Sequence, residues 1–246
     1  MILDIDIGNT NTKWRVIDKS RISLRGSQTT ESLINGQDLD LSLVARLTRA
    51  RLCSVADKSI ITELSRQLSS RFNVVLELAV VSDIACGVTC GYKDPATLGV
   101  DRWMAMIAAY SRYQEALIVV DAGSAVTLDV LRADGYHLGG YILPGIALMR
   151  ESLWSGTRQV KAGLGESALV DPAVDTEGAV NHGSLLSIIA TIEKIAKTYP
   201  SRLILTGGSA EAILRHLNIE GDFQPELVLD GLLVDGVVTI QNPESA

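Results

Sequence analysis

Residues 2–17, ILDIDIGNTNTKWRVI, decide the fold class of this chain, because they describe two strands around a polar turn. Apolar and acidic residues alternate over 2–7, which is the period-two pattern of a β-strand. Gly, Asn and Thr fill 8–12, a composition typical of a turn. Strand-like character resumes over 13–17. The stretch therefore predicts a hairpin whose turn carries Asp6 and Gly8 as an Asp-x-Gly motif.

The same pattern recurs near the middle of the chain, where 116–131 reads ALIVVDAGSAVTLDVL. A strand of the buried type ends in the turn 121–125, and a second strand leaves it. Asp6 and Asp121 thus hold equivalent places in two strand–turn–strand units. One Asp-x-Gly turn is a weak signal, because such turns are common in hairpins. Two of them, each opening about half of the chain, favour an internal duplication over a chance recurrence.

The rest of the chain mixes helical and strand-like patterns, which predicts an α/β protein. We expect loops or polar connections over 90–98 and 155–175. Strands are expected over 73–76 and 79–81 (as one strand or two), 136–143 and 202–206. Helices are expected over 41–50, 60–71, 101–113, 146–154, 180–198 and 210–217, with a last helix after the apolar segment 228–232.

Composition narrows the class of protein. The chain has 246 residues, 47% of them hydrophobic, and a formal net charge of −7. An acidic chain without a basic stripe is a poor nucleic-acid ligand. We find no secretory signal and no apolar run long enough to span a membrane, so a cytoplasmic protein is expected. Three cysteines, Cys53, Cys86 and Cys90, are too few for a disulfide framework, and a zinc site is not expected.

The two turns carry the residue types that a nucleoside triphosphate needs. Glycine lets the backbone N–H groups approach phosphate oxygens, and a carboxylate can hold magnesium. The first turn adds Thr12 as a hydroxyl and Lys13 as a cation, with Asp6 as the magnesium carboxylate; the second offers Gly123, Ser124 and Asp121. A P-loop motif and a dinucleotide-binding glycine motif are both absent from the sequence. Gly207-Gly208-Ser209 follows a strand and suits a nucleotide, or is an ordinary strand-to-helix turn.

Four motifs in order resemble the type III pantothenate kinase family. They are Asp6-x-Gly8-Asn9-Thr10-x-x-Lys13, Gly99-x-Asp101-Arg102, Asp121-x-Gly123-Ser124-Ala125-x-Thr127 and Gly139-Gly140-Tyr141-Ile142-x-Pro144-Gly145. The resemblance spans nearly the whole chain. It implies an α/β fold of two duplicated ribonuclease-H-like domains, as in the acetate and sugar kinase, heat-shock protein 70 and actin superfamily, with a nucleotide cleft between them. The expected domains are 1–114 and 115–246.

The resemblance also implies an activity, namely ATP-dependent phosphorylation of pantothenate to 4'-phosphopantothenate, the first step of coenzyme A biosynthesis. Magnesium and a monovalent cation, potassium or ammonium, are the implied cofactors. A homodimer is the implied assembly.

Residue roles follow from the matched motifs. Asp101 would be the general base, and Asp121 would hold the monovalent cation. Thr176, preceded here by Asp175 where the family often has Asn, would touch substrate from the side that faces the partner subunit. Pantothenate would be bound by Tyr92, Gly99, Val100, Asp101 and Arg102. ATP would be bound by Asp6, Ile7, Gly8, Asn9, Thr10, Asn11, Thr12, Lys13 and Ser124, the last in a place where the family commonly has Thr.

The residues themselves support a role for Asp101. A carboxylate within hydrogen-bond reach of a primary alcohol contributes about 10²–10⁴-fold to its reaction. Arg102 can pair with the substrate carboxylate. The structural alternative makes Asp101 the N-cap of the helix that follows. Two functional alternatives also stay open: another small-molecule kinase of the superfamily, and a nucleotide-binding regulatory protein without catalysis.

Overall fold

The computed structural model describes residues 1–156 and 169–239, and its contacts divide the chain into two compact units. One unit holds Met1–Arg112 together with the segment that begins at Leu227, and the other holds Tyr113–Glu226. The sequence placed the division at 114/115 and assigned everything after it to the second half. The grouping by contacts differs in the C-terminal segment, because helix α7 (Leu227–Gly231) packs with the N-terminal strands.

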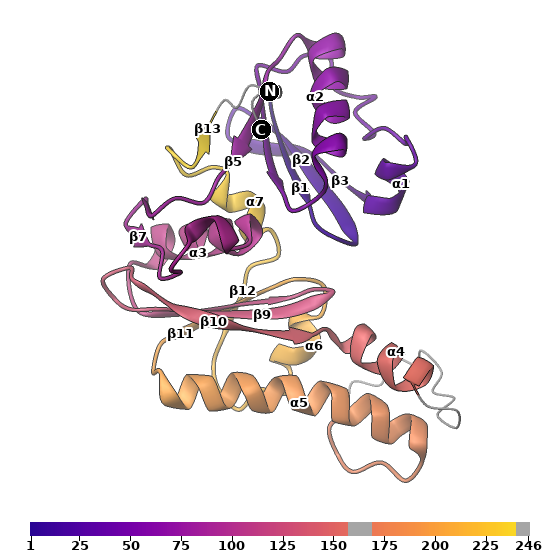
Figure 1. Cartoon of the computed structure of the whole chain (residues 1–246), viewed down its shortest axis with the longest axis vertical. Helices are drawn as coiled ribbons and strands as arrows, with labels where there is room; N and C mark the ends of the chain where they lie inside the picture. Colours follow the sequence, from indigo (N-terminus) through magenta and orange to yellow (C-terminus); the bar gives the residue numbers. More distant parts are fainter. Residues whose placement is uncertain (157–168, 240–246) are drawn as a thin grey trace. The chain divides into compact units, whose positions relative to one another are not determined.

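The first unit is built on a six-stranded sheet in the order β13-β5-β4-β1-β2-β3 (Figure 1). β1 pairs antiparallel with β2, which pairs antiparallel with β3, whereas β4 lies parallel to β1 and to β5. The strands are β1 (Ile2–Ile7), β2 (Asn11–Asp18), β3 (Arg21–Thr29), β4 (Arg49–Ser54), β5 (Leu76–Ala79) and β13 (Val238–Thr239).

The alternation in β1 sends its side chains to two different environments. Leu3, Ile5 and Ile7 are buried in a core that α2 (Lys58–Phe72) completes with Leu64 and Leu68. Asp4 and Asp6 therefore lie on the opposite face of the sheet. The other elements of this unit are α1 (Thr30–Ile34), the short hairpin β6 (Ile84–Ala85) and β7 (Val88–Thr89), the 3₁₀ helix Pro95–Thr97, and α3 (Val100–Tyr113).

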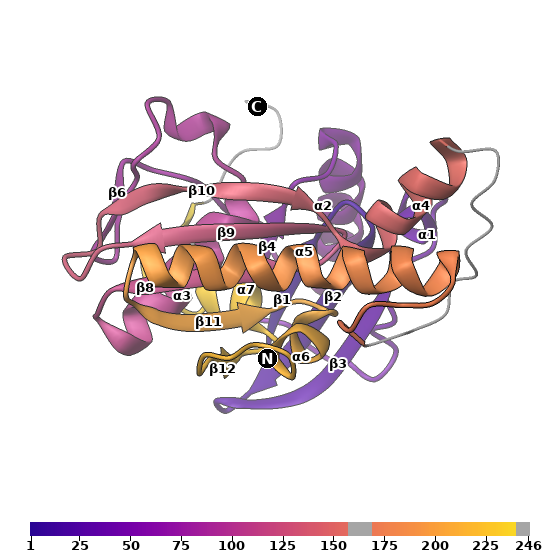
Figure 2. The same ribbon diagram turned by 90° about the horizontal axis from the view of Figure 1, so that it is seen from below.

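The second unit has a five-stranded sheet in the order β10-β9-β8-β11-β12. The long helix α5 (Thr176–Thr198) covers one face of it (Figure 2) and contributes Leu185, Ile188 and Ile192 to the core. The remaining elements are β8 (Leu117–Ala122), β9 (Ala125–Leu131), β10 (His137–Pro144), α4 (Ile146–Gly156), β11 (Arg202–Thr206), α6 (Ala210–Leu214) and β12 (Asp222–Phe223).

The two sheets repeat one topology. In each, three consecutive antiparallel strands are followed by a strand parallel to the first and then by another parallel strand. β1 and β8 are the equivalent central strands, and each ends at its Asp-x-Gly turn. The predicted hairpins and the predicted internal duplication are thereby confirmed.

One helix prediction is wrong, and a second is not met by the described residues. Residues 41–48 form a loop, and β4 begins at Arg49. Leu41, Val44 and Leu47 imitate helical spacing because each is buried in the core beneath the loop. Near the C-terminus, 228–232 largely lies in α7, and the described residues after it, 233–239, include β13 against β5 and no helix; the rest of the expected last helix, 240–246, lies outside the described residues.

The polar connection expected over 155–175 lies partly outside the described residues, at 157–168. In the described ranges, the longest and most apolar helices fall short of what crossing a membrane requires.

Candidate active site

The first loop connects β1 to β2 and exposes its polar residues. The last strand pair is Ile7 with Thr12, and Gly8 N–H donates to the Asn11 carbonyl at 3.0 Å. Asn9, Thr10 and Asn11 are exposed between these two ends. Asp6, partly exposed, and the exposed Lys13 face each other across the two strands. The loop therefore exposes Asn9, Thr10 and Asn11 beside Lys13 and Asp6, the residues for which the sequence predicts phosphate and magnesium binding.

Thr30, the first residue of α1, holds this loop in place through two hydrogen bonds to loop carbonyl groups. Its N–H donates to the Thr10 carbonyl at 2.8 Å, and its hydroxyl donates to the Gly8 carbonyl at 2.7 Å. The Thr12 and Thr30 hydroxyl oxygens are 3.2 Å apart. Since a hydroxyl has a single proton, the Thr12 hydroxyl is the donor in that pair. Thr12 is fully buried, so its hydroxyl holds the loop together, although the sequence pointed it towards phosphate.

Sequence reasoning missed Thr30. The residue carries no motif of its own, and its only local signal is its place after Thr29, whose side chain caps α1 by accepting from Ser32 N–H. Ile7, which the resemblance places among the ATP-binding residues, has its side chain in the core. Only its main chain is left to face a ligand, and its carbonyl already accepts from Val55 N–H at 3.1 Å.

Asp6 and Asp101 both influence the pKa of one buried thiol, Cys53. Cys53 on β4 is the neighbour of Asp6 across the parallel strands. Burial raises the pKa of the Cys53 thiol, and the carboxylates of Asp6 and Asp101 raise it further. Charges affect a pKa through space, and the effect decreases with distance. The loop carboxylate and the predicted base therefore both act on the same strand, β4, of the first unit.

Asp101 lies inside the first turn of α3, which begins at Val100. Its carboxylate accepts from the N–H of Arg102 at 2.8 Å, as suits an acidic group at a helix N-terminus. Gly99 makes room for it, because a Cβ at that position would lie 2.5 Å from the Asp101 carboxylate oxygen. The N-cap alternative is thus modified: Asp101 lies one residue beyond the helix start and remains partly exposed.

Arg102 is buried beside Tyr92. The guanidinium donates to the Tyr92 hydroxyl at 2.9 Å, and its central carbon lies 5.7 Å from the centre of the Tyr92 ring. Only 7% of Arg102 is exposed. The contact brings together the segment around Tyr92 and the start of α3, two of the predicted pantothenate-binding segments.

Gly145 and Gly207 pack closely against the second loop, which connects β8 to β9. Gly145 N–H donates to the Ser124 carbonyl at 3.0 Å, and a Cβ on Gly145 would lie 2.5 Å from the Gly123 carbonyl oxygen. Gly207 has a φ of +92°, and its Cβ would lie 2.5 Å from an Asp121 carboxylate oxygen. The Gly-Gly-Tyr-Ile-x-Pro-Gly and Gly-Gly-Ser motifs, which are distant in sequence, therefore converge on Asp121 and its turn.

Three backbone hydrogen bonds are repeated between the two loops. Each loop is closed by its glycine, with Gly123 N–H bonded to the Ala125 carbonyl at 3.0 Å in the second. The residue after the third strand donates to the loop, as Thr30 does to Thr10 and Gly145 to Ser124. A residue that follows the fourth strand donates to the end of the first strand, Val55 to Ile7 and Ser209 to Ala122. The duplication thus extends to the bonds that shape each loop.

Thr176 lies away from these loops in the sequence and begins α5. Asp175 caps that helix, its carboxylate accepting from Gly178 N–H at 2.7 Å. Thr176 is exposed and lines a shallow groove between α4 and α5, together with Met149, Leu153, Ala179 and Gly183. Asp175 therefore caps the helix, and the Asn that the family often has at this position would cap it equally well.

Comparisons with known proteins agree with this geometry. A family model described as type III pantothenate kinase matches residues 2–198. The type III pantothenate kinase of Chromohalobacter salexigens is 40% identical over 244 residues, which cover 94% of this chain and 86% of that protein.

Two solved structures share the fold. A Campylobacter jejuni protein assigned to the Baf family of transcriptional activators has a TM-score of 0.59 at 22% identity, covering 94% of this chain and 95% of its own. A Sinorhizobium meliloti protein assigned as a 2-dehydro-3-deoxygalactonokinase has a TM-score of 0.55 at 13% identity, covering 95% and 97%. The family model and the relative settle the classification: this chain belongs to the type III pantothenate kinase family.

Proposed function

We propose that this protein transfers the γ-phosphoryl group of ATP to the terminal hydroxyl of pantothenate, the first step towards coenzyme A. Family membership over most of the chain supports the reaction. The observation that carries its chemistry is that the carboxylates of Asp6 and Asp101, both in the first unit, raise the pKa of the same buried thiol, Cys53. The first unit then holds a carboxylate for the nucleotide metal and a base for the acceptor, two groups that phosphoryl transfer uses.

In this proposal the first loop holds the phosphates of ATP. The exposed Asn9, Thr10 and Asn11 offer backbone N–H groups, Gly8 keeps the turn tight, and Lys13 supplies positive charge. Ile7 contributes through its main chain. We assign Thr12 to the loop's support in place of a direct phosphate contact, because its hydroxyl is buried against Thr30.

Asp101 acts on the acceptor. The pantothenate hydroxyl attacks the γ-phosphorus, its proton passes to the Asp101 carboxylate, and the bond to the leaving ADP oxygen breaks. Because such transition states are loose, orientation of the hydroxyl is a large part of this role. Gly99 and Val100 border the acceptor, while Arg102 and Tyr92 recognise its carboxylate through a guanidinium that their mutual contact holds in place.

We assign the two metal ions to carboxylate oxygens of the two loops. Among the described residues no group of three or more His, Cys, Asp or Glu is placed to bind a metal. Magnesium commonly uses one or two carboxylates and completes its shell with phosphates and water. Asp6 suits that arrangement. We propose Asp121 for the monovalent cation, potassium or ammonium, and the adjacent Ser124 for ATP.

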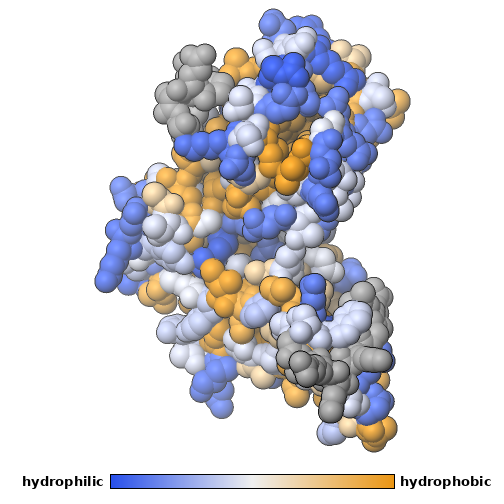
Figure 3. All heavy atoms as spheres, turned by 45° about the vertical axis from the view of Figure 1, so that its right-hand side comes forward, coloured by the Kyte–Doolittle hydropathy of each residue, from blue (hydrophilic) through white to orange (hydrophobic). Residues whose placement is uncertain are grey.

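A homodimer is proposed for the second unit. Exposed apolar side chains lie on the edge strand β10 and on α4, and they include Tyr141, Ile142, Leu148 and Trp154. Figure 3 shows apolar residues exposed on the side of the molecule on which α4 lies. Thr176, on the adjoining groove, would then reach substrate near the partner subunit. With ATP as phosphoryl donor, we keep the cytoplasm as the proposed location.

The test is a coupled assay of ADP release with ATP, magnesium, potassium and pantothenate. We expect turnover that depends on pantothenate, and a loss of about 10²–10⁴-fold in kcat for Asp101→Asn. Asn keeps an oxygen that can accept from Arg102 N–H, so the fold should be retained. Turnover with sugars but not pantothenate would favour another kinase of the superfamily. ATP binding without any acceptor-dependent turnover would favour a regulatory protein.

A further inference from the structure

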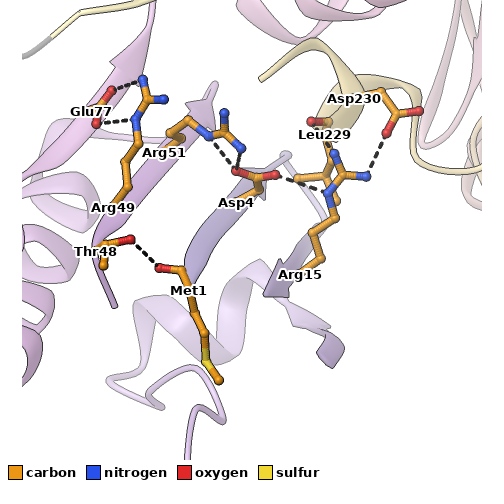
Figure 4. A network of polar contacts seen from close by, with 9 residues as sticks. All are labelled: Met1, Asp4, Arg15, Thr48, Arg49, Arg51, Glu77, Leu229 and Asp230. Atoms are coloured by element: carbon orange, nitrogen blue, oxygen red, sulfur yellow. Dashed lines mark hydrogen bonds and ion pairs between the residues drawn. The ribbon is translucent and has the colours of Figure 1, made fainter. Parts of the chain in front are cut away.

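Three charged side chains lie next to one another on adjacent strands of the first sheet, in register with Asp4, which is two residues before Asp6 on β1. Asp4 on β1 is paired in register with Arg15 on β2 and with Arg51 on β4. Its carboxylate accepts from Arg15 Nε at 3.2 Å and from Arg51 Nε at 2.7 Å. All three side chains are buried. Figure 4 shows Asp4 between the two guanidinium groups.

Arg15 reaches beyond the sheet to the C-terminal helix α7. One terminal nitrogen donates to the Asp230 carboxylate at 2.7 Å, and the other donates to the Leu229 carbonyl at 2.7 Å (Figure 4). These partners are more than 200 positions away in sequence. Nε and both terminal nitrogens of Arg15 therefore each donate a hydrogen bond, so that this side chain joins β1, β2 and α7.

Helix α7 in turn lies directly against α3. A Cβ on Gly231 would lie 2.4 Å from the Met104 carbonyl oxygen, so the two backbones approach as closely as glycine permits. Met104 is three residues after Asp101 on the same helix, which is about one turn. A continuous chain of contacts therefore runs from Asp4 through Arg15 and α7 to the helix that carries Asp101.

We infer that Arg15 is a positioning residue for the transfer reaction: it fixes α7 on the first sheet, and α7 fixes the α3 turn that bears Asp101. This inference rests on the proposed function for its catalytic consequence. The phosphate loop is separately held by Thr30. Loss of Arg15 should therefore disturb the acceptor side of the reaction more than the binding of ATP.

Arg15→Met is the main variant, because methionine fills most of the same volume without charge. Asp4 keeps Arg51, and Asp230 keeps Arg112 at 3.7 Å, so neither carboxylate loses every partner. Arg51→Met is the matched control: it removes an equally buried guanidinium from the same Asp4, but from the β4 side. Arg15→Lys keeps the charge and tests whether the fork is required.

We expect Arg15→Met to lower kcat by about 10–100-fold, the effect of a misplacement of about 1 Å. The KM for ATP should change by less than about threefold, because ground-state binding at the loop is retained. Hydrogen exchange should rise in α7 and in the first turn of α3. Arg51→Met should keep kcat within about threefold of the parent, and Arg15→Lys should fall between parent and Arg15→Met.

Two results would overturn the inference. One is unchanged exchange in α7 and α3 of Arg15→Met; the other is an equal loss of kcat in Arg51→Met, which would indicate general destabilisation. The exchange arm also separates this inference from the proposed function. If the parent protein lacks pantothenate-dependent turnover, the function fails, while exchange still decides whether Arg15 holds α7 and α3.

Discussion

Replacement of Gly207 by alanine should displace the second loop. Gly207 has a φ of +92°, and an added Cβ would lie 2.5 Å from the Asp121 carboxylate oxygen and 2.6 and 2.7 Å from backbone atoms of Ala122. A left-handed backbone costs a non-glycine residue about 1–2 kcal/mol, and forced overpacking costs about 1–3 kcal/mol. Backbone atoms of Ala122 cannot swing aside as a side chain can. The expected loss is therefore roughly 2–5 kcal/mol of the free energy of unfolding.

The neighbouring Gly208 supplies the control, since nothing lies within 4 Å of a Cβ there and its φ is unremarkable. Urea unfolding should show the loss for Gly207→Ala and a change within about 0.5 kcal/mol for Gly208→Ala. In the kinase assay, Gly207→Ala should need more potassium for half-maximal activity, because Asp121 is pushed aside. Equal stability of the two variants would refute the steric argument, and an unchanged potassium requirement would refute the proposed role of Asp121.

Three further perturbations test the first unit. Gly99→Ala should lower kcat at least about tenfold with little loss of stability, because its Cβ meets the movable Asp101 carboxylate; steady-state kinetics that match the parent would contradict this. Thr30→Val should cost about 1–3 kcal/mol and raise the KM for ATP, because the Gly8 carbonyl and the Thr12 hydroxyl lose their partner; an unaltered KM would show that the loop needs no such anchor. Cys53 keeps its proton in the fold, since burial and the two nearby carboxylates raise its pKa. The unfolded thiol ionises near pH 8.5, so stability should be full below that pH and fall by about 1.4 kcal/mol per unit above it. Urea unfolding at pH 8 and pH 10 should show this slope in the parent and a shallower one in Cys53→Ala; equal slopes would exclude the thiol as the cause.

Sequence patterns were sufficient to predict the features that depend on residues close together in the chain. The period of two in β1 and β8 determines which side chains enter the core, and the turn residues at Gly8 and Gly123 follow from their chemistry. The duplicated fold and the two loops could therefore be predicted from adjacent residues. The convergence of motifs on Asp121 was not predicted from the sequence; it follows from the fold, because the ends of β8 and β11 lie side by side.

The features that sequence patterns missed depend on partners far away in the chain. Thr30 acquires its role only when the end of β3 arrives beside the first loop. Arg15 looks like an ordinary strand residue until Asp230 and Leu229 reach it from the C-terminal segment. The helix prediction over 41–50 was wrong for a related reason: burial of the loop's apolar side chains in the core produced helical spacing without a helix. Periodicity reports burial, and it does not report which element causes it.

In the proposed function the two duplicated loops bind different ligands, phosphate at the first and a monovalent cation at the second. Their backbone bonds are equivalent, yet the residue facing the aspartate across the hairpin differs: Lys13 opposes Asp6, whereas Thr127 opposes Asp121. A lysine beside the carboxylate suits a site that must accept both magnesium and the negative charge of phosphates. A neutral hydroxyl suits a cation site, because it adds an oxygen and no competing positive charge. The proposed roles therefore assign part of the difference between the phosphate loop and the cation loop to this cross-strand residue, and Thr127→Lys should abolish the potassium dependence of turnover while leaving the first loop intact.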